Sequence, residues 1–96
     1  MSSVQRAVLI IQRPGEANRS FPIEGDALVG RSVDCGIRLE DQSVSRKHAS
    51  LRVLSGGNLE LIAASEFSPV RLNGVEIQKS VVKPGDELII GPFRLF

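Results

Sequence analysis

The sequence contains no tryptophan, tyrosine or threonine, and it has one cysteine, one histidine and four phenylalanines. Binding of single-stranded nucleic acid uses aromatic side chains between the cations, and no such aromatics accompany Arg46 and Lys47. The lone Cys35 cannot form an internal disulfide, and no other residue joins it and His48 at metal-ligand spacing. We therefore predict an intracellular, reducing environment with neither a metal site nor a cofactor.

A charge excess of one sign is also missing, because twelve basic residues face eleven acidic ones and the formal net charge is +1. Proteins that bind nucleic acid through a general positive field carry a larger excess, so nucleic acid is not an expected partner. Long apolar runs are absent as well. The apolar run Ala7 to Ile11 is far shorter than the roughly 20 residues of a membrane span and lacks a cleavage-type ending, so we expect no membrane span and no signal peptide.

The length of 96 residues is that of one domain with its own hydrophobic core. No internal repeat, linker or low-complexity segment divides the sequence. The last residue, Phe96, falls inside an expected strand. We therefore expect residues 1–96 to form a single domain that comes from the N-terminal part of a longer, multidomain protein.

Helical periodicity is nearly absent, because Gly or Pro interrupts the apolar spacing that an amphipathic helix requires. Short apolar or alternating runs recur instead, separated by turn residues. The sequence therefore predicts an all-β fold, an eleven-stranded β-sandwich of two twisted, mainly antiparallel sheets with its ligand loops at one end. The expected strands are Ala7 to Ile11, Ser20 to Ile23, Ala27 to Gly30, Gly36 to Leu39, Ala49 to Val53, Leu59 to Ile62, Val70 to Leu72, Val75 to Ile77, Ser80 to Val82, Glu87 to Ile90 and Phe93 to Phe96.

Two local patterns give sharper expectations. Asn73-Gly74 between apolar residues predicts a tight hairpin with a type I′ turn, which needs positive φ at both central residues. Residues spaced by two share one face of a strand, and such pairs of aliphatic residues are expected in the core. These pairs are Leu51 with Val53 and Leu59 with Leu61.

Three short polar motifs lie in the expected loops: Gly30-Arg31, Ser45-Arg46-Lys47-His48 and Asn73-Gly74. They sit in the segments ALVGRSVDCGIRLEDQSVSRKHASL, VRLNGVEI and VVKPGDELIIGPFRLF. In order and spacing these segments resemble the forkhead-associated (FHA) domain family over nearly the whole chain. The resemblance implies a non-enzymatic module that binds phosphothreonine on a partner protein. Since the chain has no threonine, the ligand must be supplied in trans.

The chemistry of the side chains in these polar motifs agrees with that resemblance. A phosphothreonine carries about −1.5 to −2 charges and three strong acceptor oxygens. Arginine offers a rigid fork of donors to such oxygens, and serine offers a short hydroxyl donor. The resemblance implies that Arg31, Ser45 and Arg46 contact the phosphate, while Lys47 adds at most long-range attraction.

The resemblance also assigns supporting roles. It implies that His48 is a brace that holds the serine in place, and that Gly30 gives the backbone room ahead of Arg31. It further implies that Asn73-Gly74 shapes the hairpin beside the site. Residues that flank the phosphothreonine are expected to meet the loops that carry Asp41 to Ser43 and Glu66 to Pro69.

The pattern departs from the family at one place. Most members carry Ser/Thr-Asn-Gly-Thr shortly before the second Asn-Gly, and the asparagine holds the ligand backbone. Counting back from Asn73, this chain has Glu66-Phe67-Ser68-Pro69-Val70, so Ser68 replaces the asparagine. Ser68 is predicted to contact the phosphopeptide as a shorter donor, and Glu66 would repel a phosphate that it faced.

Two other functions remain open at this stage. A degenerate FHA domain would serve as a phosphate-independent scaffold or dimerisation module, because the motif that holds the ligand backbone is lost. An enzyme would have to use Ser45 and His48, three positions apart, as nucleophile and base, with Asp34 or Asp41 as the group that orients the base. The sequence has no nucleophile elbow or oxyanion-hole motif that would support catalysis. Most family members act inside the cell and commonly in the nucleus, so a nuclear location is expected.

Overall fold

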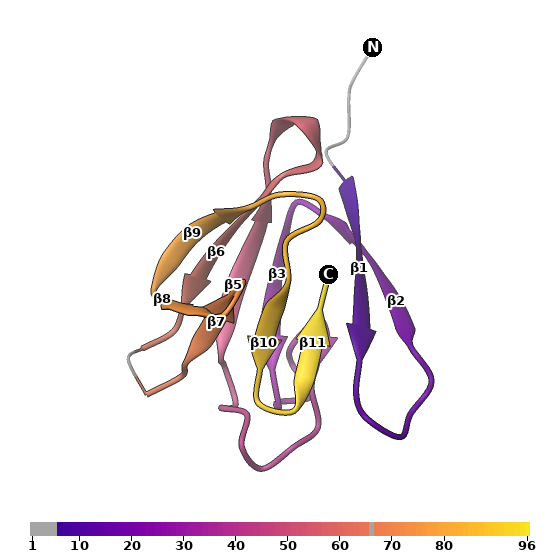
Figure 1. The fold of residues 1–96 in the computed structure, drawn as a ribbon, viewed down its shortest axis with the longest axis vertical. Helices are drawn as coiled ribbons and strands as arrows, with labels where there is room; N and C mark the ends of the chain where they lie inside the picture. Colours follow the sequence, from indigo (N-terminus) through magenta and orange to yellow (C-terminus); the bar gives the residue numbers. More distant parts are fainter. Residues whose placement is uncertain (1–5, 66) are drawn as a thin grey trace.

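Eleven strands and one turn of 3-10 helix, η1 (Ser55–Gly57), form the regular structure of the described residues, 6–65 and 67–96, in the computed structural model (Figure 1). The predicted number and order of strands along the chain are confirmed, and no strand end is shifted by more than one residue. The strands are β1 (Arg6–Gln12), β2 (Arg19–Glu24), β3 (Asp26–Gly30), β4 (Ile37–Arg38), β5 (Ala49–Val53), β6 (Leu59–Ala63), β7 (Val70–Leu72), β8 (Val75–Ile77), β9 (Lys79–Val82), β10 (Leu88–Ile90) and β11 (Phe93–Leu95).

The strands form two sheets. One has six strands in the order β2-β1-β11-β10-β7-β8, and the other has five in the order β4-β3-β5-β6-β9. The pairing is antiparallel apart from the parallel pair of β3 with β4. In Figure 1 the hairpin of β10 and β11 lies in front of β3, which belongs to the other sheet. The predicted sandwich of two mainly antiparallel sheets is confirmed.

Alternation of side chains along each strand builds the core between the sheets. On β5 and β6 every second residue is buried, and the residues between them point outward. The pairs that sequence spacing predicted to be internal, Leu51 with Val53 and Leu59 with Leu61, are all buried. Full burial of such a side chain stabilises the fold by about 1.5–3 kcal/mol. The core therefore holds the strand ends, and the loops that leave them, in fixed positions.

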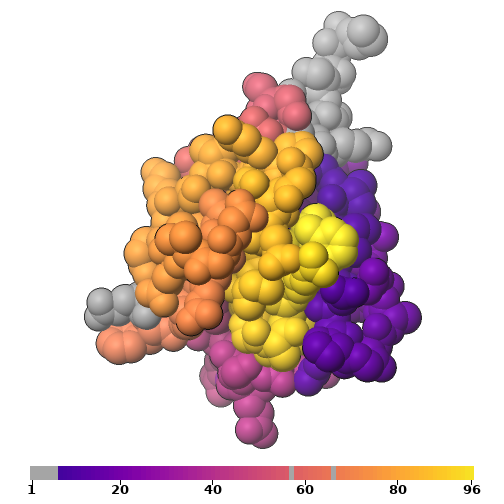
Figure 2. Space-filling model, in the orientation of Figure 1, coloured from indigo at the N-terminus to yellow at the C-terminus, as the bar shows by residue number. Residues whose placement is uncertain are grey.

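Three loops gather at one end of the sandwich. They are residues 31–36 between β3 and β4, 39–48 between β4 and β5, and 64–69 between β6 and β7. In Figure 1 the first two lie at the lower end of the molecule, and in Figure 2 magenta residues form that lower end. Glu66, which would repel a phosphate if it faced the pocket, lies outside the described residues.

The predicted Asn73-Gly74 hairpin is present between β7 and β8, with φ of 51° at Asn73 and 87° at Gly74. Positive φ at both positions is what a type I′ turn requires. The Asn73 side chain donates to Asp86 Oδ1 and accepts from the Glu87 N–H, both at 3.0 Å. Since β7 runs away from the 64–69 loop, this turn packs on the turn between β9 and β10 instead of bordering the ligand loops. The Asn73-Gly74 turn therefore supports the end of β7. It does not lie beside the candidate site, where the sequence resemblance placed it.

Candidate functional site

The 31–36 and 39–48 loops are joined by a short backbone ladder. The Arg31 N–H donates to the Ser45 carbonyl at 3.0 Å, and the Ser32 N–H donates to the Arg46 carbonyl at 3.1 Å. The structure thereby brings together Arg31, Ser45 and Arg46, the three residues that the sequence suggests as phosphate ligands. Their proximity comes from backbone geometry, so it does not depend on side-chain contacts.

Gly30 permits this close approach. A Cβ atom at position 30 would lie 2.2 Å from the Arg46 carbonyl oxygen and 3.0 Å from the His48 backbone nitrogen. The Gly30 carbonyl also accepts a hydrogen bond from the Leu39 N–H at 2.8 Å. Because backbone atoms surround the position, no side chain fits there without moving the loop.

The Arg31 side chain is half-buried and held at one end. Its Nε donates to the Val44 carbonyl at 3.1 Å, while Arg38 Nε donates to the Arg31 carbonyl at 3.1 Å. Within residues 6–65 and 67–96, neither Nη atom of Arg31 has a hydrogen bond or an ion pair. A guanidinium anchored through Nε presents its remaining N–H groups as a fork suited to an oxyanion.

Ser45 and Ser68 are joined through their hydroxyl groups. Ser68 is only 3% exposed, and its Oγ lies 2.8 Å from Ser45 Oγ in a hydrogen bond. Its backbone N–H donates to the Ser65 carbonyl at 3.1 Å, which closes a turn in the 64–69 loop. The sequence predicted that Ser68 faces a peptide. The structure places its hydroxyl in the interior, beneath Ser45, because this turn directs the side chain towards the 39–48 loop.

His48 is buried, at 1% exposed, with every polar group bonded. Its Nδ1 accepts the Ser45 backbone N–H at 3.1 Å, and its Nε2 bonds to the Pro69 carbonyl at 2.7 Å. Its own N–H donates to the Val29 carbonyl, and its carbonyl accepts from the Ala64 N–H. An acceptor at Nδ1 and a donor at Nε2 require the neutral ring with its hydrogen on Nε2. His48 therefore ties the 39–48 loop to the 64–69 loop.

The same contacts bear on the catalytic alternative. His48 receives the backbone N–H of Ser45, while the Ser45 hydroxyl bonds to Ser68. A nucleophile and its general base need a hydrogen bond between the hydroxyl and the ring. Asp34 bonds to Ser32, and Asp41 bonds to Ser43 and Arg13, so neither carboxylate orients the His48 ring. The arrangement is that of a brace.

The acidic side chains of the 39–48 loop are already engaged. Asp41 Oδ1 accepts from Arg13 at 2.9 Å, Asp41 Oδ2 accepts from the Ser43 hydroxyl and N–H, and Glu40 pairs with Arg38 at 2.8 Å. The hydrogen bond from the Ser43 hydroxyl, then that from its N–H, and the charge of Arg13 lower the pKa of Asp41 below its ordinary value. This carboxylate stays ionised and shapes the loop from within.

Three basic side chains of the two loops, in contrast, lack an acidic partner among the described residues. Arg46 and Lys47 are exposed, and in the part of the chain that the structure describes neither they nor Arg31 take part in an ion pair. The loop end therefore offers unpaired positive charge beside a serine hydroxyl. Such a set of donors is suited to a phosphate group.

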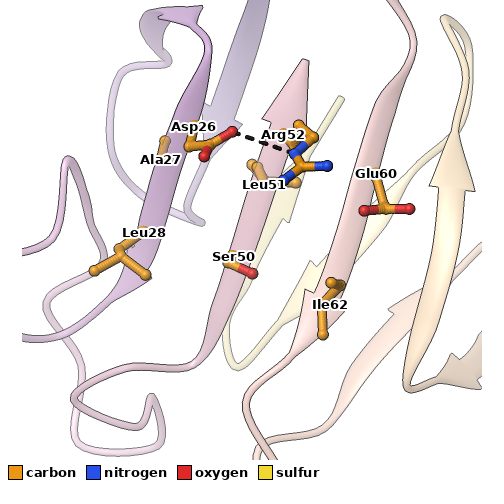
Figure 3. A pocket seen from close by; sticks show the side chains of 8 residues that line it. All are labelled: Asp26, Ala27, Leu28, Ser50, Leu51, Arg52, Glu60 and Ile62. Atoms are coloured by element: carbon orange, nitrogen blue, oxygen red, sulfur yellow. Dashed lines mark ion pairs between the residues drawn. The ribbon is translucent and has the colours of Figure 1, made fainter. Parts of the chain in front are cut away.

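Other surface features are less suited to an anion. Figure 3 shows a hollow on the outer face of β3, β5 and β6, where Ser50 lies between the half-exposed Leu28 and Ile62. Its charged side chains are paired, Arg52 with Asp26 at 3.6 Å and Glu60 with Lys79 at 4.0 Å. Among the described residues no group of three or more His, Cys, Asp or Glu side chains could hold a metal ion, and no helix is long and apolar enough to cross a membrane.

Sequence reasoning missed some contributors to the site. The Val44 carbonyl anchors Arg31, Arg38 supports the Arg31 backbone, and the Pro69 carbonyl receives His48. Two of these are backbone carbonyls, which any residue type supplies, so no sequence signal marks them. The Sγ of the buried Cys35 also bonds to the Arg46 carbonyl, at 3.2 Å.

Comparison with known protein families and sequences gives consistent matches. The family model described as FHA domain matches residues 27–91. The glycogen accumulation regulator GarA of Mycolicibacterium smegmatis is 33% identical over 90 residues, covering 93% of this chain and 56% of that protein. The oxoglutarate dehydrogenase inhibitor of Corynebacterium jeikeium is also 33% identical over 90 residues, covering 93% of this chain and 62% of that protein. The chain thus spans little more than half the length of these relatives.

Solved structures are similar over almost the entire chain. The FHA domain of FhaA, solved in complex with the intracellular domain of Rv3910, has a TM-score of 0.78 and 25% identity, with 92% of this chain and 97% of that chain covered. The FHA domain of the CT664 protein from Chlamydia trachomatis has a TM-score of 0.86 at 19% identity, with 95% and 94% covered. At 19% identity, the similarity to the CT664 domain shows a shared fold alone.

Proposed function

This chain belongs to the FHA domain family, and on that basis we propose that it binds phosphothreonine-containing segments of partner proteins through the loops that carry Arg31, Ser45 and Arg46. The observation that carries the proposal is the pairing of the Arg31 and Ser45 backbones, which sets a guanidinium whose two Nη atoms have no partner among the described residues beside a serine hydroxyl. Arg46, exposed on the same segment, adds a second cation.

The energetics favour a phosphate that is bound together with part of its peptide. Charge-assisted hydrogen bonds contribute about 1.5–3 kcal/mol each, so three of them contribute about 5–9 kcal/mol before ordering costs. A micromolar dissociation constant corresponds to about −8 kcal/mol, and association loses translational and side-chain freedom. Contacts from the residues beside the phosphothreonine must supply the remainder.

The phosphothreonine comes from outside these 96 residues, because they contain no threonine. The names of the two curated relatives, a regulator and an inhibitor, and the FhaA complex with another protein's intracellular domain support a regulatory binding module. We assign no catalysis to it, since the His48 ring meets the backbone of Ser45 and not its hydroxyl.

We propose that the domain acts inside a cell. The interior of a cell keeps a free cysteine such as Cys35 reduced, and it supplies phosphorylated partner proteins. The nuclear location expected from the sequence has no support from the two curated relatives, because both come from bacteria.

A phosphate-independent scaffold is the second candidate. It is favoured by the burial of Ser68, which leaves no side chain at that position to hold a ligand backbone. A scaffold would use another face, such as the outer hollow around Ser50. It predicts binding that ignores phosphorylation, and this separates the two candidates.

The test is a titration of three degenerate peptide pools, phosphothreonine, phosphoserine and unphosphorylated, followed by heteronuclear NMR. The variant Arg31→Ala removes the proposed phosphate ligand. Arg52→Ala is its control, because that arginine is exposed on the outer sheet face and pairs with Asp26. We expect the phosphothreonine pool, and neither of the other two, to shift resonances of Arg31, Ser45 and Arg46. These shifts should occur in wild type and in Arg52→Ala and should be absent in Arg31→Ala. Equal shifts with the unphosphorylated pool, or unchanged binding by Arg31→Ala, would contradict the proposal.

A further inference from the structure

The buried hydroxyl of Ser68 has an unusual position for a residue in a ligand loop. It lies 2.8 Å from Ser45 Oγ, and within residues 6–65 and 67–96 its side chain has no other hydrogen-bond partner. Its neighbour Phe67 is 83% exposed, so the loop turns one side chain outward and the next inward. The Ser68 hydroxyl therefore meets Ser45 and not the solvent side of the site.

This bond closes a ring of hydrogen bonds between the two loops. The Ser45 N–H donates to His48 Nδ1, and His48 Nε2 donates to the carbonyl of Pro69. Pro69 follows Ser68 directly, and Ser68 returns to Ser45 through the two hydroxyls. Ser45 is consequently held at two points, its backbone nitrogen by His48 and its side chain by Ser68.

A bound phosphate would set the direction of the hydroxyl protons of both Ser45 and Ser68. Phosphate oxygens accept strongly, so Ser45 must donate its single hydroxyl proton to the ligand. The hydrogen bond between Ser45 and Ser68 then survives only if Ser68 donates, and among residues 6–65 and 67–96 the Ser68 hydroxyl has no other acceptor. A hydroxyl that accepts one hydrogen bond is polarised and donates the next one more strongly.

We propose that Ser68 is a positioning residue that acts through Ser45, passing a hydrogen bond from Ser68 to Ser45 to the phosphate. This inference rests on the proposed function. It assigns Ser68 a different role from the ligand-backbone contact that the family resemblance gives to an asparagine at this position.

A double-mutant cycle between Ser45 and Ser68 tests the inference, with affinity for one phosphothreonine peptide from the pool measured by NMR titration. We expect Ser68→Ala to weaken binding about fivefold to tenfold, the value of a typical net hydrogen bond. In a Ser45→Ala background the same change should have less than a twofold effect, because the residue through which Ser68 acts is gone. Ser68→Thr, which keeps a hydroxyl, should restore most of the affinity.

Ser65→Ala is the matched control. Ser65 lies in the same loop, and its hydroxyl accepts the Phe67 N–H without contacting Ser45. It should leave affinity within about twofold in both backgrounds, as expected of a surface change outside the network.

Each other outcome has a definite meaning. An equal loss from Ser68→Ala in both backgrounds would show that Ser68 acts on the peptide or the fold independently of Ser45, and would overturn the inference. No loss from Ser68→Ala would overturn it while the proposed function stands. If wild type binds no phosphothreonine peptide, the proposed function fails and this inference fails with it.

Discussion

The Arg31 N–H donates to the Ser45 carbonyl at 3.0 Å, so these two candidate phosphate ligands are neighbours on adjoining backbone segments. Their spacing is set by main-chain hydrogen bonds and by the missing side chain at Gly30. Changes to backbone packing should therefore affect ligand binding as strongly as changes to the ligand residues. The predictions below test this dependence.

Gly30→Ala should destabilise the fold and abolish phosphopeptide binding. The added Cβ would meet the Arg46 carbonyl oxygen at 2.2 Å, and overpacking of this kind costs about 1–3 kcal/mol or more. Urea denaturation measures the free energy of unfolding. The control is Gly36→Ala in the same loop, where no atom lies within 4 Å of the added Cβ and the effect should stay within about 0.5 kcal/mol. Similar values for the two variants would refute the steric argument.

His48→Ala should lower stability by about 2–4 kcal/mol, because it removes a buried side chain and leaves the Ser45 N–H and the Pro69 carbonyl without their partner. Binding of the phosphopeptide should weaken as well, since the two loops lose their connection. Urea denaturation measures the free energy of unfolding of the variant and of wild type, and NMR titration of the same samples measures their affinity for the phosphopeptide. A variant as stable as wild type would contradict the bracing role of His48.

Asp41→Asn should destabilise the protein at neutral pH and have little effect in acid. The hydrogen bonds from Ser43 and the charge of Arg13 hold the pKa of Asp41 below its ordinary value of 3.8 in the folded state. Its contribution is therefore fully present above pH 3.8 and is lost as pH falls through the folded-state pKa. The free energy of unfolding of wild type and variant, measured from neutral pH to below 3.8, should converge on acidification. A constant difference would exclude this linkage.

Arg46→Ala and Lys47→Ala should separate a ligand contact from long-range attraction. Both side chains are exposed, but only Arg46 has a fork that can bond a phosphate in two places. We expect Arg46→Ala to reduce affinity about tenfold and Lys47→Ala about twofold, since exposed charges at a distance contribute less than 1 kcal/mol. Calorimetry at low and high salt should show that salt removes the Lys47 effect first. Equal losses for both would favour a diffuse electrostatic role.

Local patterns predicted most of the fold. The type I′ turn at Asn73-Gly74 and the buried alternation of Leu51 with Val53 follow from the preferences of a few adjacent residues, and both are present. Eleven apolar runs between turn residues were sufficient to predict eleven strands. Some strand ends shifted by one residue, because pairing with a neighbouring strand decides where a strand stops.

Contacts between distant segments were harder to predict. The Asn73-Gly74 turn was expected beside the ligand loops, but it bonds to Asp86 and Glu87 because β7 carries it to the far end of that strand. Ser68 was expected to face a ligand, and its burial follows from the turn closed by its N–H on Ser65.

By itself, the sequence determined the all-β class, the order of the strands along the chain and the hairpin turn, and it singled out Arg31, Ser45 and Arg46 as candidate ligands. Periodicity and turn preference act over a few residues and can be read along the chain. Only the tertiary structure decided that Arg31 is anchored on the Val44 carbonyl and that Ser68 bonds to Ser45 beneath the site. Those contacts depend on how two loops from different strands meet, and the packing of the two sheets sets that geometry.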